Sequence, residues 1–335
     1  MRKILILGGS SFSGSSFANF MLYKKYFVLS TYRQKKNILY QPHLSNENLK
    51  YLQNIHVDLN NDVNKLIKII KKFKPSYIVD FASLCMVNES WENPEVYLNI
   101  NLKNKSILIN KIKNFSFIKK YIYISTPEVF GSNEKKVKEN YKLYNPNTPY
   151  AISKLSFEML LKSYGKSFNF PYIICRFSNF FGIGQPNYRL IPKVVLSILT
   201  KKKFPLQGNG NSKRSFIETD DFSNGIYLAI KKGKIKSSYH FSTNKFYTIK
   251  DVIKKICKIK KYNYKKLIKL NKDRTGKDKI YKLNCKKTIK DLGWKPKNNF
   301  NISLKKIVLF YENNLNTLKK LKTKYLDKKL NKLFF

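Results

Sequence analysis

The chain alternates short apolar runs with longer segments in which apolar residues recur at helical spacing. The short runs are rich in Ile, Val, Leu and Tyr, a composition typical of strands covered on both faces. They predict strands at residues 3–7, 26–31, 55–57, 77–81, 121–124, 172–176 and 239–241. The helical spacing predicts helices at residues 61–73, 94–112, 150–164 and 249–259. Strands and helices in alternation indicate an α/β fold with a doubly wound parallel sheet of the Rossmann type.

A glycine-rich turn, GGSSFSG at residues 8–14, lies between the first strand and a helical pattern that continues to residue 22. Strand, glycine turn and helix in this order bring backbone N–H groups and the positive end of a helix onto a pyrophosphate. Ser11 occupies the middle glycine position of this motif, where it adds a side chain near the dinucleotide. The cofactor contacts expected in the turn are Gly8, Ser11, Phe12, Ser13 and Gly14.

The ends of the next three strands predict further contacts with the cofactor. The end of the second strand reads S-T-Y-R-Q-K-K at residues 30–36 and lacks the acidic residue that binds the free ribose 2′-hydroxyl of NAD. Arg33 in this stretch suits the 2′-phosphate of NADP, so the sequence favours NADP over NAD. Asp58 and Leu59 follow the third strand and are placed to contact the adenine ring. The fourth strand ends at Phe81, and the small residues Ala82 and Ser83 after it let the backbone approach the cofactor, so all three are expected cofactor contacts.

Tyr150 and Lys154 form the candidate catalytic pair. The helix-start sequence N-T-P precedes Tyr150, so the two side chains, four residues apart, lie on one helical face. A lysine ammonium there is expected to lower the pKa of Tyr150 and make the phenol a usable proton acceptor near neutral pH. Tyr262 and Lys266 have the same spacing without this context. The strand end that precedes Tyr150 carries three polar side chains, Ser125, Thr126 and Glu128.

The composition is strongly basic, with 67 Lys and Arg against 20 Asp and Glu and a formal net charge of +47. The lysines are scattered along the whole chain, which favours solvated lysine faces over a dedicated polyanion site. The alternative is a basic protein that binds nucleic acid or a membrane surface, helped by an amphipathic tail at residues 314–335. We expect this tail to pack its leucines on the body, and any such binding to disappear at physiological salt.

No run reaches the eighteen or so apolar residues of a membrane span, and the four cysteines show neither metal-ligand spacing nor a pairing pattern. We therefore expect a soluble, cytoplasmic protein without a metal site. Residues 1–180 are expected to form a dinucleotide-binding domain. Residues 181–335, where the periodicity weakens, are expected to form a smaller substrate domain interleaved with the first.

Several distant motifs agree, in order, with one known family. The chain resembles the extended short-chain dehydrogenase/reductases of the NAD-dependent epimerase/dehydratase family, and among them most the dTDP-glucose 4,6-dehydratases. The similarity extends to about residue 314. Besides the motifs above, it includes Asn101, R-F-S-N at residues 176–179, L-I-P at 190–192, G-N-G at 208–210 and D-R-T-G-K-D at 273–278.

The resemblance implies roles for individual residues. Tyr150 and Lys154 match the catalytic pair, Thr126 matches the hydroxyl that orients the sugar's 4-hydroxyl, and Asn101 matches a residue near a tightly bound, recycled NAD or NADP. A nucleoside-diphosphate sugar is implied to contact Ser125, Thr126, Asn179, Arg189, Arg214 and Arg274. The helices at 94–112 and 150–164 resemble the pair through which family members form homodimers.

The implied reaction converts an NDP-hexose to an NDP-4-keto-6-deoxyhexose by internal hydride transfer. Glu128 would remove the proton on carbon 5, a step that a 4-epimerase does not need. Two positions depart from the family pattern. Pro127 replaces an aspartate that protonates the leaving hydroxyl, and Ala82-Ser83-Leu84 replaces Ala-Ala-Glu/Gln. A 4-epimerase and a UDP-glucuronate decarboxylase of the same family are the alternatives.

Overall fold

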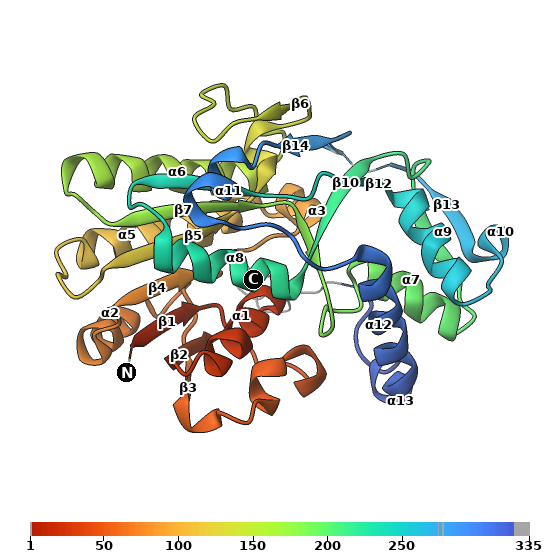
Figure 1. Cartoon of the computed structure of the whole chain (residues 1–335), viewed down its shortest axis with the longest axis horizontal. Helices are drawn as coiled ribbons and strands as arrows, with labels where there is room; N and C mark the ends of the chain where they lie inside the picture. Colours follow the sequence, from red (N-terminus) through yellow and green to blue (C-terminus); the bar gives the residue numbers. More distant parts are fainter. Residues whose placement is uncertain (1, 274, 277, 325–335) are drawn as a thin grey trace.

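A computed structural model of the chain describes residues 2–273, 275–276 and 278–324 (Figure 1). Its largest element is a seven-stranded sheet in the order β11-β7-β5-β4-β1-β2-β3, and each neighbouring pair is parallel. The strands are β1 (Lys3–Leu7), β2 (Phe27–Tyr32), β3 (Leu52–His56), β4 (Tyr77–Asp80), β5 (Lys120–Ser125), β7 (Tyr172–Phe177) and β11 (Ser237–Phe241). The predicted doubly wound parallel sheet is confirmed.

Helices cover both faces of this sheet because successive side chains of each strand point to opposite faces. Ile4 and Ile6 of β1 belong to one core, whereas Leu5 and Leu7 belong to the other. Burial on both faces explains why the strands read as continuous apolar runs. The covering helices are α1 (Phe12–Tyr23) and α8 (Thr219–Lys232) on one face, and α2 (Val63–Phe73), α5 (Asn104–Ile112) and α6 (Pro149–Ser167) on the other.

The strand order reverses beside β1. The chain proceeds from β1 outward through β2 to β3, and β4 then pairs with the opposite side of β1. Doubly wound sheets bind ligands outside the carboxyl ends of their strands at such a point. The ends of β1, β4 and β5 lead into the glycine turn, into Ala82 and Ser83, and into Thr126. The fold thus brings the predicted cofactor and catalytic segments to one edge of the sheet.

The predicted helix at residues 94–112 is one helical segment with a change of pitch. It consists of α4 (Pro94–Leu98), a π-helical turn η4 (Asn99–Lys103) and α5. Such turns are rare and are found frequently at functional sites. Asn101 lies in this π-helical turn and is fully buried.

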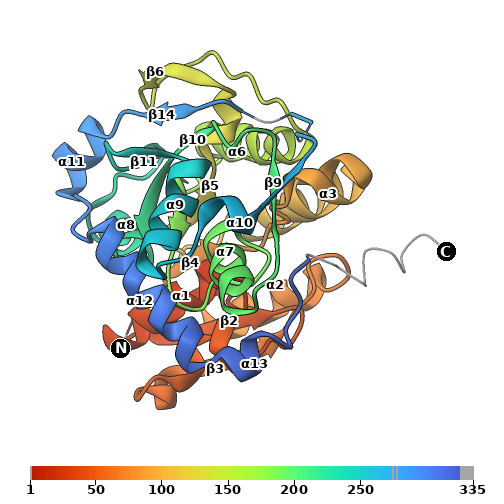
Figure 2. The ribbon, with the colours of Figure 1, turned by 90° about the vertical axis from the view of Figure 1, so that its right-hand side faces the viewer.

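A second group of elements lies beside the sheet, on the right of Figure 1 and in front of the sheet in Figure 2. These elements enclose a core of their own, to which Val194, Ile253 and Ile307 contribute fully buried side chains. The group includes α7 (Leu190–Leu199), β9 (Phe204–Gln207), β10 (Lys213–Glu218), α9 (Ile249–Ile259), α10 (Tyr264–Leu267), β13 (Ile268–Asn271), α12 (Phe300–Asn313) and α13 (Leu315–Leu318). The short elements that complete the fold are α3 (Val87–Glu92), η5 (Pro127–Phe130), β6 (Asn133–Val137), β8 (Asn179–Phe181), β12 (Phe246–Thr248), β14 (Tyr281–Leu283) and α11 (Lys286–Leu292).

The strand predicted at residues 239–241 is confirmed, but it is not the last strand of the chain, although the sequence shows no further strand pattern after it. This segment lies in β11, which closes the large sheet, but β12, β13 and β14 follow it. Those three strands contain only three or four residues each, too few to produce a periodic pattern. Because β11 pairs with β7, the second half of the chain contributes a strand to the large sheet. The division at residue 180 stays a prediction.

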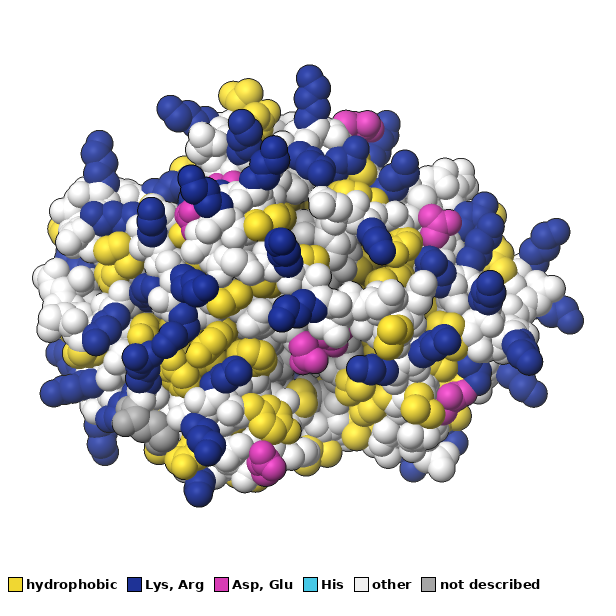
Figure 3. Space-filling model, viewed as in Figure 1, with side chains coloured by type: hydrophobic (Ala, Val, Ile, Leu, Met, Phe, Trp, Pro, Cys, Tyr) yellow, Lys and Arg dark blue, Asp and Glu magenta, His cyan; other side chains and the backbone are white. Residues whose placement is uncertain are grey.

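The basic side chains of the protein are distributed over its surface. In Figure 3, Lys and Arg side chains are spread over the whole visible face, which agrees with the scattered lysines of the sequence.

The start of the C-terminal tail contacts the body of the protein. Leu318 of α13 is fully buried, and its carbonyl oxygen accepts a hydrogen bond from Asn187 Nδ2 at 2.7 Å. The described start of the tail therefore packs on the body as expected, while residues 325–335 lie outside the described chain. Among the described residues, no helix has the length and apolar character needed to cross a bilayer.

Candidate active site

The glycine turn after β1 requires close approach between backbone segments. Gly8 has φ +75°, and a Cβ at this position would lie 2.9 Å from the backbone nitrogen of Ala82. A Cβ on Gly14 would lie 2.4 Å from the carbonyl oxygen of Gly8. Side chains at these positions would separate the turn from the end of β4 and from α1. The two glycines therefore hold the N-terminus of α1 against the carboxyl edge of the sheet, where a pyrophosphate would bind.

Ser11, at the middle glycine position, stabilises the turn itself. Its hydroxyl donates to the Gly8 carbonyl oxygen at 2.7 Å and accepts from the Gly14 N–H at 3.0 Å, which makes it the N-cap of α1. Ser13 Oγ lies 3.2 Å from Ser11 Oγ. Phe12 stacks on Phe180 of β8 with 5.4 Å between ring centroids. The turn is thus joined to β8 as well as to the sheet.

The other predicted cofactor residues line the ends of β2, β3 and β4. Leu59 and Phe81 are buried in the two cores, so they support the site from the interior. Asp58 Oδ1 accepts from the Asn60 N–H at 3.0 Å and orders the loop after β3. Arg33 follows β2 and is half-buried. These positions suit the adenosine half of a dinucleotide, and the contacts themselves stay predictions.

Tyr150 lies in the first turn of α6 and is 8% exposed. It packs edge to face against Tyr97, with 6.5 Å between ring centroids. Burial, followed by the charge of Glu128, raises the pKa of Tyr150 well above its ordinary value, while a hydrogen bond with Thr126 lowers it. The expectation of a lowered pKa is therefore wrong for the protein chain, because burial and the nearby carboxylate raise the pKa of Tyr150.

Lys154 is directed to the ends of β4 and β5. Its ammonium donates to the Ile124 carbonyl oxygen at 2.7 Å and to Ser83 Oγ at 3.0 Å, and lies 4.1 Å from the ring centroid of Tyr123. Burial, and after it the charge of Lys105, lower the pKa of Lys154 to about 7. The charge of Lys154 is therefore sensitive to pH in the neutral range.

Thr126 and Glu128 are fixed next to Tyr150 by the 3₁₀ turn η5. Thr126 caps this turn, since its Oγ1 accepts from the Glu128 N–H at 3.2 Å, and it lies 3.4 Å from Glu128 Oε1. Pro127 is buried at the first position of the turn, where a missing N–H and a fixed φ are favourable. Ser125 is buried at the end of β5, and among the described residues its hydroxyl has no hydrogen-bond partner.

Asn101 connects three segments behind the site. Its Oδ1 accepts from the Leu84 N–H at 2.9 Å, and its Nδ2 donates to the Leu84 carbonyl oxygen at 3.0 Å and to Ser153 Oγ at 3.0 Å. The side chain thus holds the loop after β4 against α6. We propose that Asn101 supports the cofactor site by positioning this loop.

The predicted substrate residues lie in two groups. Arg214 donates to the Asp278 carbonyl oxygen at 2.9 Å and stacks on Tyr281 with 4.6 Å from its Cζ to the ring centroid. The Tyr281 hydroxyl in turn donates to Asn179 Oδ1. Arg189, at the start of α7, donates to Cys85 Sγ at 3.1 Å. Arg274 lies outside the described residues.

Sequence reasoning missed several residues of this region. Tyr281 joins Arg214 to Asn179, yet it lies in a three-residue strand and no local pattern marks it. Cys85 faces Arg189 although its spacing suggested no function. Asp80 and Lys105 form a fully buried ion pair behind Ser83. The sequence signal for this pair is Asp80, an acidic residue at the end of an apolar strand.

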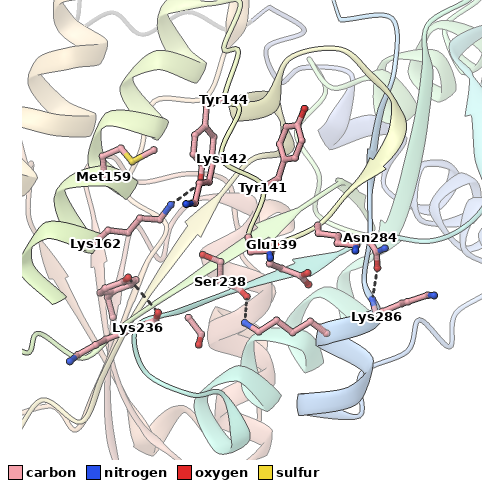
Figure 4. Close-up of a pocket in the computed structure, with 15 residues that line it drawn as sticks. Glu139, Tyr141, Lys142, Tyr144, Met159, Lys162, Lys236, Ser238, Asn284 and Lys286 are labelled. Carbon is pink, nitrogen blue, oxygen red and sulfur yellow. Dashed lines mark hydrogen bonds between the residues drawn. The ribbon is translucent and has the colours of Figure 1, made fainter. Parts of the chain in front are cut away.

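A separate hollow of about 890 Å³ lies at the opposite ends of the strands (Figure 4). Tyr172, which begins β7, and Ser237 and Ser238, which begin β11, line it, so it does not belong to the Tyr150 site. Its lining includes six lysines, Lys138, Lys142, Lys162, Lys236, Lys286 and Lys287. Two of these are engaged, because Lys162 donates to the Tyr144 hydroxyl and Lys287 to the Ser238 carbonyl oxygen, each at 2.7 Å. The hollow is part of the general basic surface.

The residues at the carboxyl edge of the sheet fit a dinucleotide. The glycines of the turn let backbone segments come closer together than a side chain at these positions would allow. The N-terminus of the twelve-residue helix α1 faces this edge. A ligand bound at the same edge would give the buried Ser125 hydroxyl a hydrogen-bond partner. Among the described residues, no group of His, Cys, Asp or Glu could hold a metal ion. Fold and site together define an extended short-chain dehydrogenase/reductase.

Comparison with known proteins gives the family within this class. The profile of the GDP-mannose 4,6 dehydratase family matches residues 5–307, and the chain belongs to this family. The dTDP-D-glucose 4,6-dehydratase of Dictyostelium discoideum is 29% identical over 94% of this chain and 83% of its own length. The dTDP-glucose 4,6-dehydratase of Haemophilus influenzae is 27% identical over 93% of this chain and 98% of its own length.

Solved structures of similar proteins agree with the fold. The dTDP-glucose 4,6-dehydratase of Streptomyces venezuelae, solved with NAD bound, has a TM-score of 0.87 and 25% identity over 96% of this chain and all of its own. The dTDP-glucose 4,6-dehydratase of Bacillus anthracis, also in complex with NAD, has a TM-score of 0.85 and 28% identity over the same shares.

Proposed function

We propose that this protein is a nucleotide-sugar 4,6-dehydratase that converts an NDP-hexose to an NDP-4-keto-6-deoxyhexose. The observation that carries the proposal is the placement of Glu128 beside Thr126 and Tyr150 at the edge of the sheet. A hydroxyl, a carboxylate and a phenol next to one another supply the groups for removing two protons from neighbouring positions of a sugar. The curated relatives described above carry the same activity in their names.

The first step is removal of the proton from the sugar's 4-hydroxyl. Tyr150 accepts this proton, and Thr126 orients the hydroxyl by a hydrogen bond. The ammonium of Lys154 favours the phenolate electrostatically, although in the chain itself burial and Glu128 oppose ionisation of Tyr150. A bound NAD would supply the acceptor for the hydride of carbon 4 and the donor that returns it to carbon 6, and carbon 5 would regain a proton at that stage.

The second step is elimination. A ketone at carbon 4 acidifies the hydrogen on carbon 5, and Glu128 removes it while the hydroxyl leaves carbon 6. Pro127 cannot protonate that leaving group, so the proton comes from water or from another side chain. Burial of Thr126 and Tyr150 limits the access of bulk water to the reacting carbons.

NAD is the cofactor that we propose. The two solved dehydratases described above hold NAD, and their fold extends over 96% of this chain. The preference of the sequence for NADP depended on Arg33 and on the missing acid after β2. Titration of the protein with either dinucleotide would measure this preference.

Arg214 is proposed to bind the diphosphate of the substrate. A planar guanidinium can contact two phosphate oxygens at once, and stacking on Tyr281 fixes its plane. Asn179 is held to the same tyrosine and faces the same region. Arg189 is proposed to contact the sugar or the nearer phosphate, since it contacts Cys85 in the loop after β4.

The purified protein should convert one member of a panel of NDP-hexoses to its 4-keto-6-deoxy product without net formation of NADH. The panel comprises dTDP-glucose, CDP-glucose, GDP-mannose and UDP-N-acetylglucosamine, and the alkaline absorbance of the ketone reports the product. The bound cofactor returns to its oxidised form in each cycle, so it does not accumulate as NADH. Products that are only C4 epimers, or a pentose released with carbon dioxide, would favour the epimerase or the decarboxylase.

A homodimer is the proposed assembly. Four apolar side chains on the helices of the expected interface are exposed by 39–44%, namely Leu98, Ile107, Ile152 and Met159. We expect light scattering at micromolar concentration to give twice the mass of the chain, 39.5 kDa. Ile152→Glu should shift the protein to the monomer, since it places a charge in an apolar contact.

The control for this experiment is Leu309→Glu on α12, where Leu309 is 57% exposed and lies outside the expected interface. This variant should keep the dimeric mass. A monomeric wild-type protein would contradict the proposal.

Cytoplasmic location is proposed as well. Both the chemistry of nucleotide-sugar pathways and the free cysteines suit that compartment.

The alternative of another class is a basic nucleic-acid or membrane-surface binding protein on a dehydrogenase scaffold. The charge of +47 and the lysine-lined hollow favour it. Against it, a binding protein has no chemical need for Glu128, Thr126 and Tyr150 in one cluster. Tight, salt-resistant RNA binding by a protein that binds neither dinucleotide would establish the alternative.

A further inference from the structure

A buried ion pair lies directly behind Lys154. Asp80 ends β4 and Lys105 lies in the first turn of α5, and both side chains are 0% exposed with 2.7 Å between Lys105 Nζ and Asp80 Oδ2. Asp80 also accepts from the Tyr121 hydroxyl at 2.8 Å and from the Ala82 N–H at 2.9 Å. Buried charges are tolerated when their remaining polar atoms are satisfied, and this carboxylate has three donors.

Ser83 connects the pair to Lys154. The Ser83 hydroxyl oxygen accepts from Lys105 Nζ at 3.0 Å and from Lys154 Nζ at 3.0 Å, which uses both of its lone pairs. Two bonds of this length to one atom hold the two ammonium groups within about 6 Å of each other in a site remote from water. Both ammonium groups also lie near the ring of Tyr123, at 5.0 Å for Lys105 and 4.1 Å for Lys154.

We propose that Lys105 and Asp80 position Lys154 for the reaction, because Lys105 fixes Ser83 as an acceptor for Lys154 and the opposite charges of the pair govern the charge of Lys154. The inference rests on the proposed function, in which Lys154 supports Tyr150. Lys105 acts through Ser83 and through its electric field, so it is a positioning residue.

The charges around Lys154 set the direction of the expected effects. Burial lowers the pKa of Lys154 most, Lys105 lowers it further, and Asp80 raises it. Loss of the Lys105 cation should therefore raise the pKa of Lys154, so that the ammonium persists to higher pH. The titratable and charged groups that face Lys154 come from β4, the following loop, β5, α5 and α6, and they are Asp80, Cys85, Tyr123, Lys105, Tyr150 and Glu158.

The test compares Lys105→Met, which removes the cation, with Ser83→Ala, which removes the shared acceptor. The titration of Lys154 is followed by NMR of isotope-labelled lysine ε-carbons, and its signal is the one missing from Lys154→Arg. We expect Lys105→Met to move this titration up by on the order of one pH unit. Ser83→Ala should move it down, because the ammonium loses a hydrogen bond that favours the charged form.

Lys111→Met on the same helix is the matched control, because Lys111 is exposed, and it should leave the titration unchanged. General damage to the structure would not shift the two test variants in opposite directions. An unchanged Lys154 titration in a folded Lys105→Met protein would overturn the proposal. If that variant fails to fold, an unchanged titration in Ser83→Ala overturns it.

The titration needs no sugar nucleotide, so it stays informative even if the substrate panel gives no product. In an active enzyme, the high-pH limb of the pH–rate profile for sugar oxidation should also move to higher pH in Lys105→Met. KM should change little. A purely structural role of the ion pair would lower kcat at every pH without moving that limb.

Discussion

Tyr150→Phe should abolish oxidation of the sugar, with a loss on the order of 10³-fold or more in the rate at which added substrate reduces bound NAD. The phenylalanine keeps the edge-to-face contact with Tyr97 and the packing of the site, but it has no oxygen to accept the proton of the 4-hydroxyl. The measurement is the rise of reduced-nicotinamide absorbance in a single turnover. Binding of the substrate should change little, since the ring remains in place.

Tyr262→Phe is the matched control. Tyr262 has the same four-residue spacing to Lys266, but it is partly buried and packs against the core of the second group of elements, away from the carboxyl edge of the sheet. Loss of its hydroxyl should leave the single-turnover rate unchanged. Full oxidation by Tyr150→Phe would show that another group accepts the proton, and the assignment of the catalytic pair would then be wrong.

Glu128→Gln should separate the two halves of the reaction. Oxidation should proceed and reduced cofactor should accumulate, because elimination stalls without a base for carbon 5, with a loss of about 10²–10⁴-fold in product formation. A second effect follows from the electrostatics of the site. After burial, the charge of Glu128 is the main cause of the raised pKa of Tyr150. Its removal lowers that pKa, so oxidation should extend to lower pH than in the wild type.

The control for Glu128→Gln is Glu134→Gln, because Glu134 is an exposed carboxylate a few residues further along the chain. That variant should form product at the wild-type rate with the wild-type pH profile. Retention of full dehydration by Glu128→Gln would assign the base to another carboxylate. Stalled oxidation in Glu128→Gln would indicate that the carboxylate acts in the first step.

The sequence by itself determined the fold class and the position of the site. The seven predicted strands all lie in the parallel sheet, because strands buried on both faces leave long apolar runs that local reading detects. The glycines at positions 8 and 14 were readable for a similar reason, since close backbone contact excludes side chains. The helix start before Tyr150 also follows from local chemistry, as the Thr148 cap shows.

Other features are set by contacts between residues far apart in the chain, which no local pattern records. The pKa of Tyr150 is one example, because burial and Glu128 act on it across the fold and reverse the expected direction. Asn101 is another, since its partners Leu84 and Ser153 come from a loop and a helix elsewhere in the sequence. The three short strands after β11 were missed because their pairing depends on distant partners rather than on their own composition.

The pair of Asp80 and Lys105 shows the physical reason most directly. In a chain with 67 Lys and Arg, a lysine on a helix is expected to face solvent, and the sequence gives no sign that Lys105 is different. Its charge is tolerated in the interior only because folding brings Asp80 and Ser83 within hydrogen-bonding distance. The sequence therefore determined which residues form the edge of the sheet, while the tertiary structure decided which charges meet behind it.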